Sequence, residues 1–151
     1  FWTTNTASPP PNLFKRFFMH KSFLIIAASL CGLAVILGAF GAHGLRQVVD
    51  ATSITTFETG VRYHFYHSFA LLVTGMLYER FKNKWIQFAG YCFLAGIILF
   101  SGSLYALTLL KATNTVGLSG IGVITPIGGL FFIAGWIALI RALSLRPWRI
   151  V

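Results

Sequence analysis

Residues 22–42 read SFLIIAASLCGLAVILGAFGA, an apolar run that contains no charged residue. A helix needs about 20 mostly apolar residues to cross the hydrocarbon of a bilayer, and this run meets that length. The runs Trp85–Leu110 and Ile121–Leu143 are also long enough, whereas Phe65–Tyr78 is shorter and needs the polar segment before it to complete a span. The sequence therefore predicts an all-α integral membrane bundle of four transmembrane helices, over about residues 22–43, 55–81, 85–110 and 121–143.

The composition of the 151 residues supports a membrane protein. Hydrophobic residues make up 56% of the chain, charged residues only 10%, and the mean hydropathy is +0.76. A soluble domain carries about 25% charged residues, so this chain lacks the polar surface that water requires. Because four helices use nearly all of residues 19–151, we expect no soluble catalytic domain there. Cys31 and Cys92 both lie inside apolar runs, which predicts packing residues and indicates neither a disulfide nor a metal motif.

Basic residues flank the apolar runs and give a net charge of +9. They form no stripe interleaved with aromatic residues, so we interpret them as membrane anchors and expect no nucleic-acid partner. If all four helices span, nine basic residues share one face of the membrane and three share the other. Lys and Arg are enriched on the cytoplasmic side, which predicts that both termini are cytoplasmic, or on the matrix side in a mitochondrion. The nine are Lys15, Arg16, Lys21, Arg80, Lys82, Lys84, Arg141, Arg146 and Arg149, and the three are Arg46, Arg62 and Lys111.

Residues 1–18 differ from the rest of the chain. Polar residues and the run Pro9-Pro10-Pro11 are typical of an extended, poorly structured segment. Phenylalanines next to Lys15 and Arg16 at its end indicate contact with the membrane interface. Further along, Thr55 and Glu58 have the spacing of a capping box, which predicts that the second helix begins at Thr55 and that Glu58 pairs with Arg62.

Small residues predict where the helices approach one another closely. Ala34, Gly38 and Ala42 recur at every fourth position of the first helix, a pattern that allows close packing of membrane helices. We therefore expect helix packing at Ala34, Gly38, Gly41, Ala42, Gly102, Gly128 and Gly129.

Polar side chains of all four helices fall in the outer half of the predicted membrane. On the second helix, Tyr63, His64, His67 and Ser68 lie within an arc of about 140°, which we expect to face the bundle interior, whereas Tyr66 points elsewhere. Polar groups at such depth are costly in lipid and are usually buried in protein. The predicted polar cluster comprises His43, Tyr63, His64, His67, Ser101, Ser103, Tyr105 and Thr125.

This cluster has several chemical interpretations, of which interhelical hydrogen bonding is favoured. Haem ligation would need His43 together with His64 or His67, and the sequence has no haem-attachment motif. A quinone or a lipid headgroup is an alternative ligand for the tyrosines and histidines. No metal and no cofactor is predicted, because no carboxylate or cysteine stands at ligand spacing beside the histidines. The three carboxylates, Asp50, Glu58 and Glu79, are scattered, so no catalytic site is predicted.

The ordered motifs resemble a known family. They are Gly38–Leu45, Phe57-Glu58-Thr59-Gly60 leading into Tyr63–His67, Phe100–Tyr105, and Thr125–Gly129 with Gly135-Trp136, and they resemble the transmembrane protein 256 family over about residues 19–143. The resemblance implies a small four-helix protein of a bacterial inner membrane or a mitochondrion, with a domain of unknown function. It implies no reaction, substrate or cofactor.

We therefore expect a multi-pass protein of the bacterial inner membrane, with a mitochondrial membrane as the alternative location. The expected role is a non-enzymatic accessory or structural subunit of a larger membrane protein complex, in contact with the lipid bilayer and other subunits. The second interpretation is a quinone, lipid or haem site in the outer half of the bundle, and the third is a small transporter. A transporter needs a polar path through the inner half, where the sequence offers chiefly Ser29.

Overall fold

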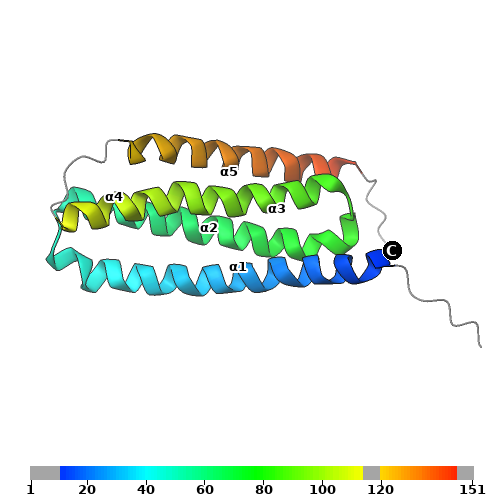
Figure 1. Cartoon of the computed structure of the whole chain (residues 1–151), viewed down its shortest axis with the longest axis horizontal. Coiled ribbons are helices and arrows are strands. Elements are labelled where there is room, and N and C mark those ends of the chain that lie inside the picture. Colours follow the sequence, from blue (N-terminus) through cyan, green and yellow to red (C-terminus); the bar gives the residue numbers. More distant parts are fainter. Residues whose placement is uncertain (1–10, 114–119, 146–151) are drawn as a thin grey trace, which may run out of the picture.

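The computed structural model describes residues 11–113 and 120–145, and within these ranges it contains helices and turns but no strand (Figure 1). The prediction of an all-α fold is confirmed for these residues. The elements are α1 (Pro11–His43), the 3-10 turn η1 (Leu45–Gln47), α2 (Ala51–Phe81), α3 (Lys84–Gly96), the π-helical turn η2 (Ile97–Ser101), α4 (Gly102–Ala112) and α5 (Ile121–Ser144).

The helices run up and down side by side. The elements α3, η2 and α4 follow one another without a break and form one rod (Figure 1). Helix α2 packs against α1 on one side and against α3, η2 and α4 on the other, while α5 packs against α3, η2 and α4. In Figure 1, α1 and α5 therefore lie at opposite edges of the bundle and α2 is an inner helix.

Within the described part of the chain, three helical segments are long and apolar enough to cross a membrane, namely Lys21–Gln47, Lys84–Ala112 and Ile121–Ser144. Large apolar side chains cover their outward faces, for example Val35 and Ile36 on α1 and Ile133 on α5. A soluble monomer rarely exposes such a surface, whereas lipid tails match it. Helix α2, which carries threonines and histidines, is not among the three segments.

Helix α2 begins earlier than the capping-box prediction placed it, so the assignment of Thr55 as the N-cap is wrong. Asp50 caps the helix, because its carboxylate accepts hydrogen bonds from the Ser53 amide at 2.9 Å and the Ser53 hydroxyl at 2.8 Å. Aspartate is among the best N-cap residues and Thr is weaker. The Thr55 hydroxyl donates to the Ala51 carbonyl one turn back, and Glu58 lies 3.9 Å from Arg46, not in the predicted pair with Arg62.

The N-terminal segment also differs from expectation. Residues 1–10 lie outside the described part of the chain, but Pro11–Phe18 belongs to α1 and is not extended. A proline is well tolerated in the first turn of a helix, because its missing N–H has no partner there in any case. The apolar helix that follows extends back through this polar flank, which hydropathy alone does not reveal.

Close approach of helices occurs at some of the predicted small residues. Ala34 is buried, and a Cβ on Gly41 would stand 2.9 Å from the Phe57 ring. Gly38 and Gly129 are more loosely packed, since a Cβ there would meet its nearest atom at 3.5 and 3.8 Å. Two predicted packing positions need correction: Ala42 is exposed, and a Cβ on Gly102 would meet no atom within 4 Å. Among the described residues, neither position is therefore a point of close contact between helices.

Candidate functional site

In the half of the bundle that the sequence predicts to be the outer one, the buried polar side chains centre on α2. His64 and His67 are 2% and 6% exposed, and Ser68 is fully buried. Positions three and four apart lie on one side of a helix, and this side faces η2, α4 and α5. The prediction that these three residues face the interior of the bundle is confirmed. Tyr63 lies at the edge of the arc with 39% exposure, and its ring contacts Phe100 at 4.8 Å between centroids.

Both ring nitrogens of His67 have partners. Nδ1 lies 2.8 Å from the backbone carbonyl of Tyr63. A carbonyl oxygen only accepts, so Nδ1 must carry the proton and donate it. Nε2 is then an acceptor, and the indole N–H of Trp136 on α5 donates to it at 3.3 Å. The His67 ring also stacks on Phe132 at 3.5 Å between centroids and an interplanar angle of 10°. These contacts hold a neutral imidazole in one tautomer.

His64 is only half satisfied. Its Nδ1 lies 3.1 Å from the hydroxyl oxygen of Tyr105 on α4, while its Nε2 is buried and lacks a hydrogen-bond partner among the described residues. The backbone carbonyl of His64 accepts from the Ser68 hydroxyl at 2.8 Å. The His64–Tyr105 pair therefore ties α2 to α4, and it leaves one polar nitrogen free in the interior.

Ser101 and Ser103, on the rod formed by α3, η2 and α4, have different environments. Ser103 donates to the Phe100 carbonyl at 2.8 Å, so the 2.6 Å contact between Ser103 and Thr125 has Thr125 as its donor. This contact ties α4 to α5. Ser101 ends the π turn, and its buried hydroxyl has no hydrogen-bond partner in the described part of the chain. Single π turns inside α-helices frequently occur at functional sites.

The predicted cluster is thus three separate interhelical contacts, and the side chains of three predicted members, His43, Tyr63 and Ser101, form none of these hydrogen bonds. His64 pairs with Tyr105, His67 with Trp136, and Ser103 with Thr125. His43 is exposed at the end of α1 and joins none of them. The imidazole pair that haem ligation would need, His43 with His64 or His67, is therefore not assembled. Among the described residues, no three His, Cys, Asp or Glu side chains gather as metal ligands would.

Sequence reasoning missed two parts of the polar network. Trp136 is not a member of the predicted polar cluster, although its position one turn after Phe132 puts both on the side of α5 that meets His67. At the opposite end of the bundle, Gln87 donates to the Tyr78 hydroxyl, and the Asn83 amide donates to the Ala142 carbonyl at 3.1 Å. This end of the bundle, which the sequence predicts to be the inner half, therefore carries more polar contacts than the sequence suggested.

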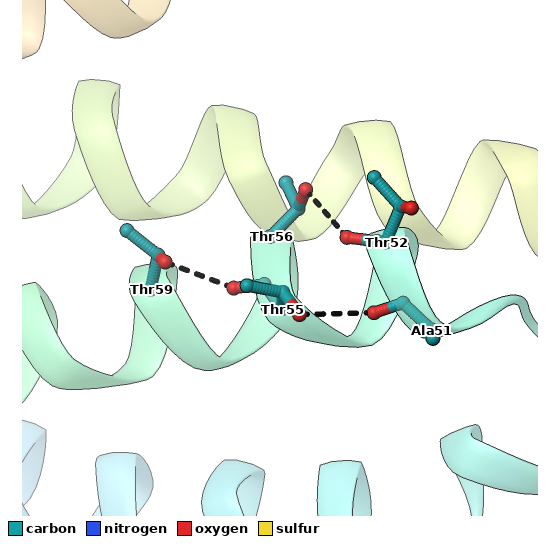
Figure 2. A pocket seen from close by; sticks show the side chains of 5 residues that line it. All are labelled: Ala51, Thr52, Thr55, Thr56 and Thr59. Atoms are coloured by element: carbon teal, nitrogen blue, oxygen red, sulfur yellow. Dashed lines mark hydrogen bonds between the residues drawn. The ribbon is translucent and has the colours of Figure 1, made fainter.

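A hollow lies along the N-terminal end of α2, with a volume of about 440 Å³ (Figure 2). Three hydroxyls along this face donate to carbonyls of the same helix: Thr55 to Ala51 at 3.0 Å, Thr56 to Thr52 at 3.0 Å, and Thr59 to Thr55 at 2.8 Å. We call the residues Ala51, Thr52, Thr55, Thr56 and Thr59 the threonine face. Four of its five residues carry a hydroxyl group, but the protons of Thr55, Thr56 and Thr59 are already used.

A second hollow, of about 490 Å³, lies where α2 meets α5. Its wall is almost wholly aromatic and mostly apolar, and His67, Tyr66 and Trp136 supply its polar groups. We call it the aromatic hollow, and its residues are Phe65, Tyr66, His67, Phe69 and Trp136.

Comparison with known proteins places the chain in a family. The family model described as "Protein of unknown function (DUF423)" matches residues 37–129. The UPF0382 membrane protein YwdK of Bacillus subtilis is 42% identical over 81% of this chain and 95% of its own length. The UPF0382 inner membrane protein YgdD of Escherichia coli is 35% identical over 85% of this chain and 95% of its own length. No solved structure matches significantly.

The resemblance noted in the sequence predicted a family of small membrane proteins of unknown function, and this part of it is confirmed. The match covers the end of α1, all of α2 to α4 and the start of α5. It therefore includes His64, His67, Ser101, Tyr105 and Thr125, while Trp136 lies beyond its end. The chain belongs to the DUF423 family, whose curated members are named UPF0382 membrane proteins.

Proposed function

We propose that this chain is a non-catalytic accessory subunit of a larger membrane protein complex, and that a helix of a partner subunit packs on the threonine face. The observation that carries the proposal is the hollow along that face (Figure 2). Small side chains let two membrane helices approach closely. Because the protons of Thr55, Thr56 and Thr59 already bond to α2, a partner can cover these hydroxyls without leaving a donor unpaired.

The contacts of three ionisable groups, Asp50, Glu58 and His67, support a role without catalysis. Asp50 is engaged as the cap of α2, and Glu58 lies beside Arg46. Each nitrogen of His67 already has a partner within the bundle. General acid–base catalysis needs a group that can exchange a proton with a substrate. Asp50, Glu58 and His67 have structural partners instead.

We further propose that α2 is a fourth span and that the protein lies in a bacterial inner membrane. Helix α2 runs beside three helical segments of membrane-spanning character and is enclosed by α1 on one side and α3 to α4 on the other (Figure 1). Polar residues are tolerated in a membrane when they face neighbouring helices, as His64 and His67 do. The name of the Escherichia coli relative supports the inner membrane as the location.

Photocrosslinking in native membranes tests the accessory role. A photoreactive phenylalanine at position 55 lies on the threonine face, and one at position 133 lies on the outward face of α5, where Ile133 is 57% exposed. We expect a specific protein adduct at position 55 and mainly lipid adducts at position 133. Native mass spectrometry of the extracted protein supplies the stoichiometry. Lipid adducts alone at both positions, together with a monomeric particle, would contradict the proposal.

A small-molecule site in the outer half is the second candidate function. The specific observation in its favour is the aromatic hollow, which borders the buried histidine His67.

A further inference from the structure

The aromatic hollow faces outward and lies next to a defined hydrogen-bond acceptor. Four of its aromatic side chains are partly exposed: Phe65 by 40%, Tyr66 by 57%, Phe69 by 55% and Trp136 by 45%. They project from α2 and α5, two helices of the bundle. A molecule that enters this hollow therefore comes from the lipid phase. The volume of about 490 Å³ is in the range of small-molecule sites.

The tautomer of His67 determines which groups the hollow can recognise. Its Nδ1–H is held by the Tyr63 carbonyl at 2.8 Å, one turn back on the same helix. Nε2 therefore presents a lone pair, and a ligand must donate a hydrogen bond to pair with it. The Phe132 ring stacked on His67 keeps the imidazole from rotating away.

The hydrogen bond that Nε2 of His67 accepts from Trp136 is long. The indole nitrogen of Trp136 lies 3.3 Å from Nε2, beyond the usual range of about 2.7–3.2 Å for such bonds. The Trp136 side chain is 45% exposed and forms part of the outer wall, while its ring also packs edge to face on Phe93 at 5.1 Å between centroids. A hydroxyl group placed between the two rings would donate to Nε2 of His67 and accept from the indole N–H of Trp136. One hydroxyl thus satisfies both residues.

We propose that the aromatic hollow binds a lipid-soluble phenol or hydroquinone, with one ring hydroxyl between His67 and Trp136. The surrounding rings of Phe65, Tyr66 and Phe69 suit an aromatic ligand, since ring pairs gain from offset or edge contacts. A quinone carbonyl or an ether oxygen can accept from Trp136 but cannot donate to Nε2. Such a ligand would leave a buried nitrogen unpaired, which is costly. This inference rests on the second candidate function and does not depend on the accessory role.

A matched pair of probes tests the proposal on the full chain in phosphatidylcholine nanodiscs. The first probe is 4-decylphenol, and the second is 4-decylanisole, which has a methyl group in place of the hydroxyl proton. Each of the four tryptophans gives one indole ¹⁵N–H signal in NMR spectra, and Trp136→Phe assigns the signal of Trp136. We expect the phenol to shift this signal saturably, and the anisole to require an about tenfold higher mole fraction.

Equal titrations for the two probes would overturn the proposal. So would the absence of a saturable shift with the phenol, or equal shifts of all tryptophan signals, which would indicate partitioning into the bilayer alone. These outcomes concern the unmodified protein and do not require a partner subunit, so they are independent of the crosslinking result.

Variants locate the ligand. Phe69→Ala removes part of the wall and should weaken phenol binding several-fold, whereas Phe88→Ala, at a similarly exposed phenylalanine of α3, should leave it unchanged. His67→Phe keeps a ring but removes the acceptor, so the preference for the phenol over the anisole should disappear. If Phe69→Ala and Phe88→Ala weaken binding equally, the ligand does not occupy this hollow. Should His67→Phe fail to fold, the two alanine variants and the probe pair still decide the outcome.

Discussion

A Cβ atom on Gly128 would stand 2.3 Å from the backbone nitrogen of Phe100. At this point α5 meets the π turn η2 with no side chain between the two backbones. The neighbouring residues Thr125 and Ser103 form their 2.6 Å hydrogen bond near the same crossing. The missing side chain of one glycine therefore allows the close approach on which this polar contact depends.

Gly128→Ala should destabilise the bundle by about 1–3 kcal/mol, the usual cost of an overpacked site, because a backbone atom cannot rotate away from the new methyl group. Gly129→Ala is the matched control. Its Cβ would meet the nearest atom at 3.8 Å, so this substitution should add only the stabilising effect of the higher helix propensity of alanine. Unfolding in mixed micelles with increasing sodium dodecyl sulfate measures both. Equal stability of the two variants would contradict the crossing as described.

Two buried serines near this crossing should respond differently to removal of their hydroxyls. Ser101 has no hydrogen-bond partner among the described residues, whereas Ser103 bonds to the Phe100 carbonyl and Thr125. We expect Ser101→Ala to leave the free energy of unfolding unchanged or to raise it by up to about 1 kcal/mol, since it removes an unpaired polar atom. Ser103→Ala should lower it by about 0.6 kcal/mol, a typical value for an interhelical hydrogen bond in a membrane protein. The same unfolding assay applies, and a larger loss for Ser101→Ala would refute this assignment.

The fold was readable from the sequence because lipid constrains it strongly. Long apolar runs and the basic residues between them are sufficient to predict spanning helices. The interior arc of α2 could be predicted for a similar reason: polar residues at positions 64, 67 and 68 avoid lipid by facing other helices. The pattern of apolar residues does not predict which side chain of a neighbouring helix each polar group will bond to. That partner depends on the relative height and rotation of two helices, which is why Trp136 was missed and His43 was wrongly included.

The start of α2, the π turn and the packing of small residues also depend on contacts that the sequence pattern does not reveal. Asp50 and Thr55 both precede plausible first turns, and Asp50, the stronger N-cap residue, caps the helix through the amide and hydroxyl of Ser53. The π turn at Ile97–Ser101 has no sequence signal of its own. It is associated with the tight crossing at Gly128, a tertiary contact. Small residues on a helix likewise indicate packing only if a neighbour covers that side, as Ala42 and Gly102 illustrate by their lack of contacts.

The cap of α2 should make stability depend on pH. Hydrogen bonds from the Ser53 amide and the Ser53 hydroxyl lower the pKa of Asp50 below its ordinary value. A carboxyl group whose pKa is lowered by folding adds stability above its unfolded pKa of about 3.9, and this contribution disappears as the pH falls through the folded pKa. Asp50→Asn retains a good cap that does not titrate. We therefore expect the native chain to exceed Asp50→Asn in thermal midpoint at neutral pH and to lose this advantage in acid. A difference that stays constant with pH would contradict the role of the carboxylate.

The orientation of the bundle predicts a specific labelling pattern in intact cells. Val48 lies in the turn between α1 and α2, and Lys82 lies in the turn between α2 and α3, and both are exposed. The turn at Lys82 lies between the basic residues Arg80 and Lys84, so by the preference of Lys and Arg for the cytoplasmic side it should lie inside and Val48 outside. In a chain whose Cys31 and Cys92 are replaced by alanine, Val48→Cys should react with a membrane-impermeant maleimide in spheroplasts. Lys82→Cys should react only after permeabilisation. The reverse pattern would contradict the orientation, and labelling of both positions from the same side would show that α2 does not span the membrane.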